Sequence, residues 1–246
     1  MIDTIICGDC LEVMQTIPDK SVDMVLADLP YGTTKLKWDS LIPLEPLWRE
    51  ISRVTKDDSA LVFTASQPFT TTLISSNIEQ FRYEWVWIRT HGANFLTANY
   101  QPLKAHENVV VFSRRPAAYT KNGTPMRYNP QRFKGKLRRG EDGYTNKADY
   151  GIKKFTPKTD GLLRYPNTLI ETKNHNAGRY VVTQKPVALF EYLIQTYTNE
   201  GDTVLDPTCG SGTTAVACRK SNRHYICIEK EPEYCAIAEK RLREML

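Results

Sequence analysis

The sequence lacks several features that mark whole classes of protein. No apolar run approaches the ~20 residues needed to cross a bilayer, so we expect no membrane span. The first residues, Met1 to Thr4, carry neither the basic nor the apolar region of a secretory signal, and we therefore expect a cytoplasmic protein. Hydrophobic residues at 41% and charged residues at 25% are ordinary for a soluble globular chain. A chain of 246 residues can hold one sizeable core with one inserted module.

Residues at metal-ligand spacing are scarce. The four histidines are scattered, and among the six cysteines only Cys7 and Cys10 form a C-x-x-C pair. A structural zinc site usually needs a second such pair, so we predict no metal. In a reducing compartment disulfides are rare, and we expect the cysteines to pack as small buried side chains.

Two phosphate-binding signatures are also missing, G-x-G-x-x-G and G-x-x-x-x-G-K-[ST]. Nevertheless, Gly210-Ser211-Gly212 lies between a strand pattern and a helix pattern, and Glu229 closes the next strand about 23 residues after Asp206. Dinucleotide-binding folds place the acid that binds ribose hydroxyls at this spacing. A glycine loop with such an acid, but without the phosphate fingerprint, favours a nucleotide-like cofactor without phosphates over NAD or ATP.

Strand and helix patterns alternate along most of the chain. The strand-like runs are short and apolar on both faces, as in a covered parallel sheet, so we expect an α/β, Rossmann-like, mostly parallel fold. The expected strands are Thr4–Cys7, Val22–Ala27, Ala60–Thr64, Tyr83–Ile88, Asn108–Phe112, Thr203–Leu205 and His224–Ile228. The expected helices are Leu11–Ile17, Leu44–Val54, Pro68–Ser76, Val187–Tyr197, Thr213–Ser221 and Glu233–Leu246.

This alternation stops between Arg114 and Gly178, a stretch too long for an ordinary connection. From Arg114 to Lys158 there are thirteen Lys and Arg residues against three Asp and Glu residues, a local net charge of +10 in a chain of net +5. A basic segment on an acidic body predicts a polyanionic partner, although charge alone fits a solvated loop equally well. We expect an inserted module at 114–179, flanked by 1–113 and 180–246. The basic residues expected to bind phosphates are Arg132, Lys134, Lys136, Arg138 and Arg139.

A compact loop with an acid, a proline and an aromatic ring follows the expected strand Val22–Ala27. In open α/β sheets ligands bind at the carboxyl ends of strands, so this loop and the glycine loop belong at one edge. Asp28 and the carbonyl of Leu29 can accept hydrogen bonds from a planar amino group. Pro30 stiffens the turn, and Tyr31 can stack on a base. Taken alone, these four residues also fit a structural turn.

Four segments, in this order, resemble the beta class of S-adenosylmethionine-dependent DNA amino-methyltransferases. They are Gly8-Asp9-Cys10, Asp28-Leu29-Pro30-Tyr31, Thr183-Gln184-Lys185-Pro186 and Asp206 to Thr214. The resemblance implies the methyltransferase type of the Rossmann-like fold with a circularly permuted motif order. It also implies a catalytic domain at 1–113 and 180–246 and a target-recognition region at 114–179. The sequence departs from the commoner Asp-Pro-Pro-Tyr at Leu29, where only the backbone carbonyl is needed.

The same resemblance implies the roles of the site residues. The catalytic loop would be Asp28, Leu29, Pro30 and Tyr31. The segments Trp85 to Arg89 and His91 to Asn94 look like the base-pocket motif, although Trp85 and Trp87 also fit packing of the sheet against a helix. Four of the cofactor residues have structural alternatives. Asp9 can cap a helix, Glu229 can form a cap or pair with Arg223, and Lys185 can lie on the surface. Cys209 can fill the loop with only its backbone near the ligand. The implied cofactor-binding residues are Asp9, Cys10, Thr183, Lys185, Asp206, Pro207, Cys209, Gly210, Ser211, Gly212, Thr213 and Glu229.

For activity, the resemblance implies methyl transfer from S-adenosylmethionine to adenine N6 in double-stranded DNA, with the base flipped out of the duplex. An initial Asp, here Asp28, favours adenine N6, whereas an initial Ser is more typical of cytosine N4 enzymes. The chain has no Pro-Cys dipeptide, which argues against methylation of cytosine C5. Cytosine N4 methylation, an RNA substrate and a catalytically silent nucleic-acid-binding module stay open. So do the presence of a cognate restriction endonuclease as partner and the choice between monomer and homodimer.

Overall fold

The computed structural model describes residues 2–33, 39–121, 123–135, 163–172, 180–181 and 183–245, apart from the side chain of His91. The chain forms two compact units, one made of 1–129 and 168–246 and the other of 130–167. Among the described residues, no helix is long and apolar enough to cross a membrane.

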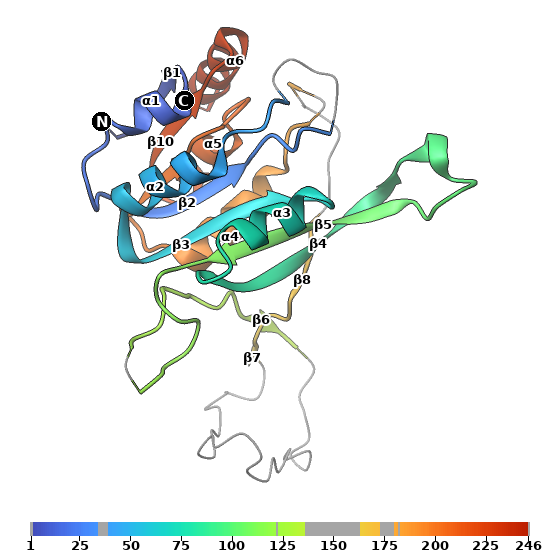
Figure 1. The fold of residues 1–246 in the computed structure, drawn as a ribbon, viewed down its shortest axis with the longest axis horizontal. Helices are drawn as coiled ribbons and strands as arrows, with labels where there is room; N and C mark the ends of the chain where they lie inside the picture. The colour runs from blue at the N-terminus through green and yellow to red at the C-terminus, as the bar shows by residue number, and fades with distance from the viewer. Residues whose placement is uncertain are drawn as a thin grey trace. The chain divides into compact units, whose positions relative to one another are not determined.

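A mostly parallel sheet forms the centre of the first unit (Figure 1). Its strands are β1 (Thr4–Cys7), β2 (Val22–Asp28), β3 (Thr55–Ala65), β4 (Phe81–Ala93), β5 (Lys104–Phe112), β8 (Leu169–Glu171), β9 (Thr203–Asp206) and β10 (His224–Glu229). The eight strands lie in the order β1-β10-β9-β2-β3-β5-β4-β8, and β5 runs antiparallel to both of its neighbours. The expected α/β fold with a mostly parallel sheet is therefore confirmed.

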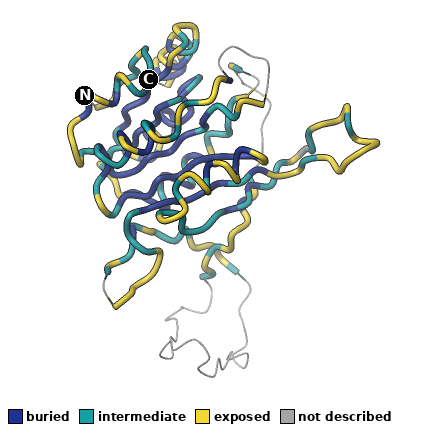
Figure 2. The backbone as a smooth tube through the Cα atoms, viewed as in Figure 1, coloured by how far each residue is buried: buried dark blue, intermediate teal, exposed yellow. Residues whose placement is uncertain are grey.

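Helices cover both faces of this sheet, which explains why its strands are apolar on both sides (Figure 2). Successive residues of β2 point to opposite faces, so Met24 and Leu26 join one apolar cluster while Val25 and Ala27 join the other. One face carries α1 (Cys10–Met14), α2 (Leu44–Val54) and α3 (Phe69–Ser76). The other carries α4 (Val187–Tyr197), α5 (Thr213–Lys220) and α6 (Pro232–Arg243).

Four neighbouring strands bring the sequence motifs to one edge. β1, β10, β9 and β2 are adjacent and parallel, and Asp9, Glu229, Asp206 and Asp28 lie at or just after their carboxyl ends. The chain winds outward in opposite directions from the neighbours β9 and β2, so the strand order reverses between them. In α/β sheets a ligand crevice forms at such a reversal.

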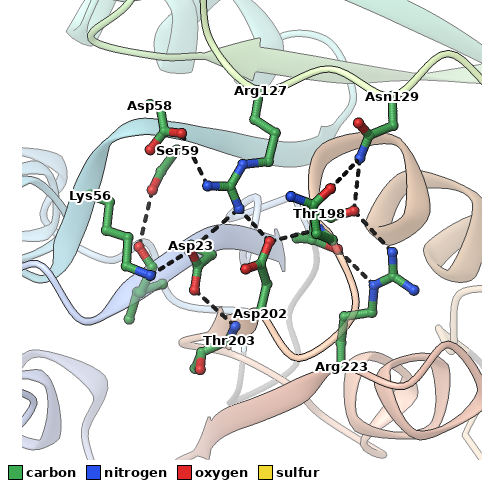
Figure 3. A network of polar contacts seen from close by, with 12 residues as sticks. Asp23, Lys56, Asp58, Ser59, Arg127, Asn129, Thr198, Asp202, Thr203 and Arg223 are labelled. Carbon is green, nitrogen blue, oxygen red and sulfur yellow. Dashed lines mark hydrogen bonds and ion pairs between the residues drawn. The ribbon is translucent and has the colours of Figure 1, made fainter.

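The amino ends of the strands are held by a polar network around Arg127 (Figure 3). Its guanidinium donates to Asp58 at 3.1 Å, contacts Asp23 at 3.4 Å and also pairs with Asp202. The Asp23 carboxylate is buried and receives a second cation, Lys56, at 2.7 Å. Arg127 therefore joins β2, β3 and the start of β9, and this basic residue of the expected insert belongs to the first unit.

Two parts of the sheet differ from the sequence-based expectation. β4 and β5 extend beyond the sheet as a hairpin, whose tip contains the 3-10 turn η1 (Phe95–Thr97) and exposes Leu96 and Tyr100 (Figures 1 and 2). Their polar outer halves carry no strand pattern, so the sequence predicted only the buried halves. β8 lies inside the segment 114–179, yet it pairs with β4 and widens the main sheet.

Within the second unit the structure describes residues 130–135 and 163–167. β6 (Phe133–Lys134) pairs antiparallel with β7 (Leu163–Arg164). Arg132 lies 4.6 Å from the centre of the Tyr165 ring and donates to its hydroxyl at 2.8 Å. Of the other expected phosphate-binding residues, Lys134 is exposed on β6, and Lys136, Arg138 and Arg139 lie outside the described residues.

Candidate active site

A cavity of about 590 Å³ lies at the edge where the carboxyl ends of β1, β10, β9 and β2 meet. This volume is within the usual range for small-molecule sites. Seven acidic and three basic residues line it, so the wall suits a ligand with a positive charge better than a phosphate. The acids are Asp9, Asp28, Asp39, Glu107, Asp206, Glu229 and Glu231, and the bases are Arg89, Lys185 and Lys230.

The carboxylate of Asp28 already accepts three hydrogen bonds. Its Oδ1 accepts from the hydroxyls of Tyr31 at 2.7 Å and Thr64 at 2.5 Å. Its Oδ2 accepts from the ammonium of Lys185 at 2.6 Å. A carboxylate oxygen has two lone-pair positions, so Oδ2 keeps one that can accept from an incoming amino group.

Burial and the charge of Asp28 change the pKa values of both Lys185 and Tyr31. Burial lowers the pKa of Lys185, but the negative charges of Asp28 and Glu107 outweigh it, and the pKa ends above its ordinary value. Burial and the charge of Asp28 raise the pKa of Tyr31 well above its usual range. The Tyr31 ring stacks on Phe69 with 5.2 Å between centroids, so one ring face is already covered.

The glycine loop is fastened to the next strand. The Glu229 carboxylate accepts from the backbone N–H of Gly210 and from that of Glu231, both at 2.8 Å. It therefore holds the loop after β9 against the end of β10, and it does not contact Arg223, whose hydrogen bonds go to Thr198 and Ser221. Each Glu229 oxygen keeps a lone pair for a ligand hydroxyl. Burial raises the pKa of Glu229 above its ordinary value.

Gly212 is required for packing as well as for backbone conformation. Its φ is 78°, a left-handed value that favours glycine. A Cβ at this position would stand 2.7 Å from the Cβ of Ala238 in α6, closer than real carbon atoms approach. The loop and α6 therefore touch through this glycine.

Asp206 is a buried acid at the end of β9. Its Oδ1 accepts from the Thr208 N–H at 3.0 Å, and Oδ2 accepts from the Thr214 hydroxyl. Burial raises the pKa of Asp206 to about 7, because these hydrogen bonds only partly offset the loss of water. Near neutral pH this residue can therefore donate or accept a hydrogen bond.

The loop after β1 supplies the next part of the wall. Asp9 caps α1 by accepting from the Leu11 N–H at 2.9 Å, which confirms the capping alternative, and Lys230 lies 3.6 Å from its other oxygen. Asp9 also lines the cavity, so the cap leaves it beside a ligand.

Almost all of the expected catalytic and cofactor residues line this one cavity. All four residues of the loop Asp28 to Tyr31 do so. Gly212 is the exception among the expected cofactor residues, because it faces α6. The expected cofactor residues that line the cavity are Asp9, Cys10, Thr183, Lys185, Asp206, Pro207, Cys209, Gly210, Ser211, Thr213 and Glu229. Among these residues, Lys185 lies next to the catalytic-loop candidate Asp28, with which it forms an ion pair.

Three further polar residues of the site were not predicted from the sequence. Thr64 lies one residue before the end of β3 and donates to Asp28, and Asp39 accepts from the N–H groups of Gly32 and Thr33 at 2.8 and 2.9 Å. Glu107 on β5 contacts Lys185 at 3.3 Å and Arg89 at 3.2 Å. Glu107 directly precedes an apolar run, a position typical of an exposed strand end. It is buried only because β5 pairs with its neighbours inside the sheet. The described residues contain no cluster of His, Cys, Asp and Glu suited to a metal ion.

Comparisons with known proteins agree with this geometry. A family model described as DNA methylase matches residues 22–240. The chain is 27% identical over 251 residues to the type II methyltransferase M.HpaI of Haemophilus parainfluenzae, covering 97% of this chain and 73% of that protein. It is 30% identical over 257 residues to the type II methyltransferase M.BglII of Bacillus subtilis, covering 94% of this chain and 66% of that protein.

Solved structures share the fold. The M1.HpyAVI–SAM complex has a TM-score of 0.65 and 23% identity over 97% of this chain and 98% of that one. The cytosine-N4-specific PvuII DNA methyltransferase has a TM-score of 0.68 and 17% identity over 97% of this chain and 85% of that one. Since the DNA methylase model spans most of the sequence, from the start of β2 to α6, this chain belongs to the N6/N4 DNA methylase family.

Proposed function

We propose that this chain transfers a methyl group from S-adenosylmethionine to the N6 amino group of adenine in double-stranded DNA. The observation that carries the proposal is the shared cavity. The loop Asp28 to Tyr31 and the glycine loop Asp206 to Thr214 line one space, so an amine and a cofactor would meet there. Membership of the DNA methylase family supports the reaction class.

The acceptor side of the reaction follows from the chemistry of an aromatic amine. Its lone pair is delocalised into the ring, so it is a weak nucleophile until its N–H groups are hydrogen-bonded. The free lone pair on Asp28 Oδ2 and the backbone carbonyl of Leu29 offer two acceptors. They would orient the amine and stabilise the positive charge that develops on its nitrogen, and a proton is then lost to solvent.

Tyr31 would bind the flipped base. Phe69 covers one face of its ring, so a base would stack on the other face or on its edge. Base–aromatic stacking contributes about 1–3 kcal/mol, which offsets part of the cost of taking a base out of the duplex.

The residues around the glycine loop fit the proposed cofactor. Glu229 has spare lone pairs for ribose hydroxyls, and Asp9, Ser211 and Thr213 offer further polar groups. The acidic wall suits the positively charged sulfonium, which, when bound, supplies an activated methyl group. Of the three bases in the lining, Lys185 pairs with Asp28, Arg89 with Glu107 and Lys230 with Asp9, which fits a cofactor without phosphates.

Adenine N6 is favoured over cytosine N4 by the acid that opens the catalytic loop. In the resembling family an initial Asp, here Asp28, is more typical of adenine enzymes. Cytosine N4 is the second candidate, because the fold neighbour PvuII is named as cytosine-N4-specific. The segment 114–179 is proposed as the target-recognition region, with the second unit, 130–167, as its separately folded part.

Methyl transfer to duplex DNA tests the proposal. Asp28→Ala should lose two to three decades in rate, about 3–4 kcal/mol, while it still binds cofactor and DNA. Asp57→Ala is the matched control, because this acid lies on the surface and pairs with Lys20. The proposal fails if the wild-type protein transfers no labelled methyl group to any DNA, or if folded Asp28→Ala turns over normally.

Calorimetry tests the cofactor site separately. Asp206→Ala and Gly210→Asp should both weaken S-adenosylmethionine binding strongly, because the first removes the buried acid and the second fills the loop with a charge. Unchanged affinity in both variants would show that the cofactor binds elsewhere.

A further inference from the structure

Glu107 is a cavity residue to which none of the sequence motifs gives a role. It is 9% exposed, lies on β5 and lines the same cavity as the loop Asp28 to Tyr31. Its Oε1 accepts from Arg89, whereas its buried Oε2 has no hydrogen-bond partner and only stands 3.3 Å from the Lys185 ammonium. Leaving a buried charged oxygen without a hydrogen bond is unfavourable, so a donor that moved closer to Oε2 would stabilise Glu107.

The ammonium of Lys185 is shared unequally between two carboxylates. Its Nζ is 2.6 Å from Asp28 Oδ2 and 3.3 Å from Glu107 Oε2. The proposed target amine needs the same Asp28 oxygen, because Tyr31 and Thr64 occupy both lone pairs of Oδ1. While Lys185 is bound tightly to Oδ2, that oxygen is a weaker acceptor for the amine.

We propose that Glu107 is a positioning residue that takes the Lys185 ammonium from Asp28 when the target amine enters. The inference rests on the proposed function. As Nζ moves toward Oε2, Asp28 becomes a stronger acceptor and Glu107 gains its missing hydrogen bond. The step makes and breaks no covalent bond.

The surrounding charges keep the free-energy cost of this movement small. Arg89, Glu107, Lys185 and Asp28 alternate in sign, so the ammonium moves between two carboxylates and stays paired throughout, and Lys104 adds a nearby positive charge. Arg89 holds Oε1 and keeps the Glu107 side chain in place. The pKa of Lys185 lies above its ordinary value, so this residue stays an ammonium and acts through its charge rather than as a base.

A double-mutant cycle with Glu107→Gln and Lys185→Met tests the inference, using the full chain and a methylatable duplex. Glu107→Gln should slow single-turnover methyl transfer about tenfold, in the range expected for contacting charged groups. Its affinities for S-adenosylmethionine and DNA should stay near those of the wild type, because Glu107 acts through Lys185 and not on either ligand. In the Lys185→Met background, the same change should have no further effect on the rate.

Glu84→Gln is the matched control. Glu84 lies on the neighbouring strand β4, accepts from Asn108 at 3.0 Å and is outside the cavity lining, so its rate should equal that of the wild type. If Glu107→Gln does not fold, Glu107→Asp replaces it in the cycle, with the same requirement that its effect vanish without Lys185.

Two results would overturn the inference in a protein that methylates DNA. One is an unchanged rate in folded Glu107→Gln. The other is an equal loss in the wild-type and Lys185→Met backgrounds, which would mean that Glu107 acts independently of Lys185. An inactive wild-type protein would instead contradict the proposed function.

Discussion

At the scale of the residue, Asp206 combines burial with a negative charge. Its pKa is raised to about 7 from an ordinary value of 3.8 because the carboxylate is removed from water. The folded state therefore holds a proton that the unfolded chain has already released between about pH 4 and pH 7. In this window the contribution of Asp206 to the free energy of unfolding should fall as the pH rises, and it should level off above pH 7.

Asp206→Asn should remove this contribution, since an amide does not titrate. Urea unfolding of both proteins from pH 4 to pH 8 gives the check, with the difference between them isolating Asp206 from the other acids. The wild type should lose stability relative to Asp206→Asn as the pH rises. Parallel curves would contradict a raised pKa at this position.

How far single residues could be predicted depended on whether their roles are local. Asp28, Asp206 and Glu229 directly follow or close apolar strand patterns, so their place at the carboxyl edge could be predicted. Two of the three partners of Asp28 could not be predicted, because Thr64 and Lys185 are 36 and 157 residues away in the chain. Such pairs depend on which strands are neighbours, and residue patterns do not encode strand order.

At the scale of the element, the junction between the glycine loop and α6 gives a sharp test of packing. Gly212→Ala would place a Cβ 2.7 Å from that of Ala238, at a φ of 78°. Gly201→Ala is the matched control, because Gly201 has a φ of +80° but no atom within 4 Å of the added carbon. The two variants share the backbone strain, and only the first adds a clash.

Gly212→Ala should therefore lower the free energy of unfolding by about 1–3 kcal/mol more than Gly201→Ala, the usual effect of overpacking. Thermal or urea unfolding of the two variants measures the difference. Equal losses would mean that the loop and α6 do not touch as described.

The bounds of helices and strands were predicted well where one apolar pattern extends over the whole element. α2 and α4 have the expected bounds, because their buried faces repeat at helical spacing. β8 was missed since its three residues bury only Ile170 and become a strand only by pairing with β4. β3 begins at Thr55, earlier than expected, because its first residues are polar and gain their partners from β2.

At the scale of the whole molecule, two of the basic residues from Arg114 onward stabilise the fold. Arg127 holds the strands of the first unit together, and Arg114 donates to the backbone carbonyls of Ser52, Thr55 and Lys56. Because these two cations stabilise the fold, the net charge of the segment from Arg114 to Lys158 overstates the positive charge that can neutralise DNA phosphates.

Arg127→Met should destabilise the first unit by about 1–3 kcal/mol, because Asp58 and Asp202 each lose a charged partner that is only partly exposed to solvent. Unfolding experiments measure this loss, and S-adenosylmethionine affinity of the folded variant should not change, since Arg127 lies at the opposite edge from the cavity. A stable variant with impaired cofactor binding would contradict the structural role.

The basic residues within 130–167 should instead govern the salt dependence of DNA binding. Replacing both Arg138 and Arg139 with Ala should reduce the slope of log affinity against log salt by about 2, one released counterion for each charge. Filter binding or fluorescence anisotropy at several salt concentrations measures the slope. An unchanged slope would mean that these arginines do not neutralise phosphates.

The product of the reaction tests the central claim most directly. DNA from cells that express the chain can be digested to nucleosides and separated, with Asp28→Ala expressed at the same level as the comparison. We expect N6-methyladenine with the wild-type chain and almost none with Asp28→Ala. N4-methylcytosine as the sole product would contradict the adenine assignment, and equal N6-methyladenine from both proteins would contradict the role of Asp28.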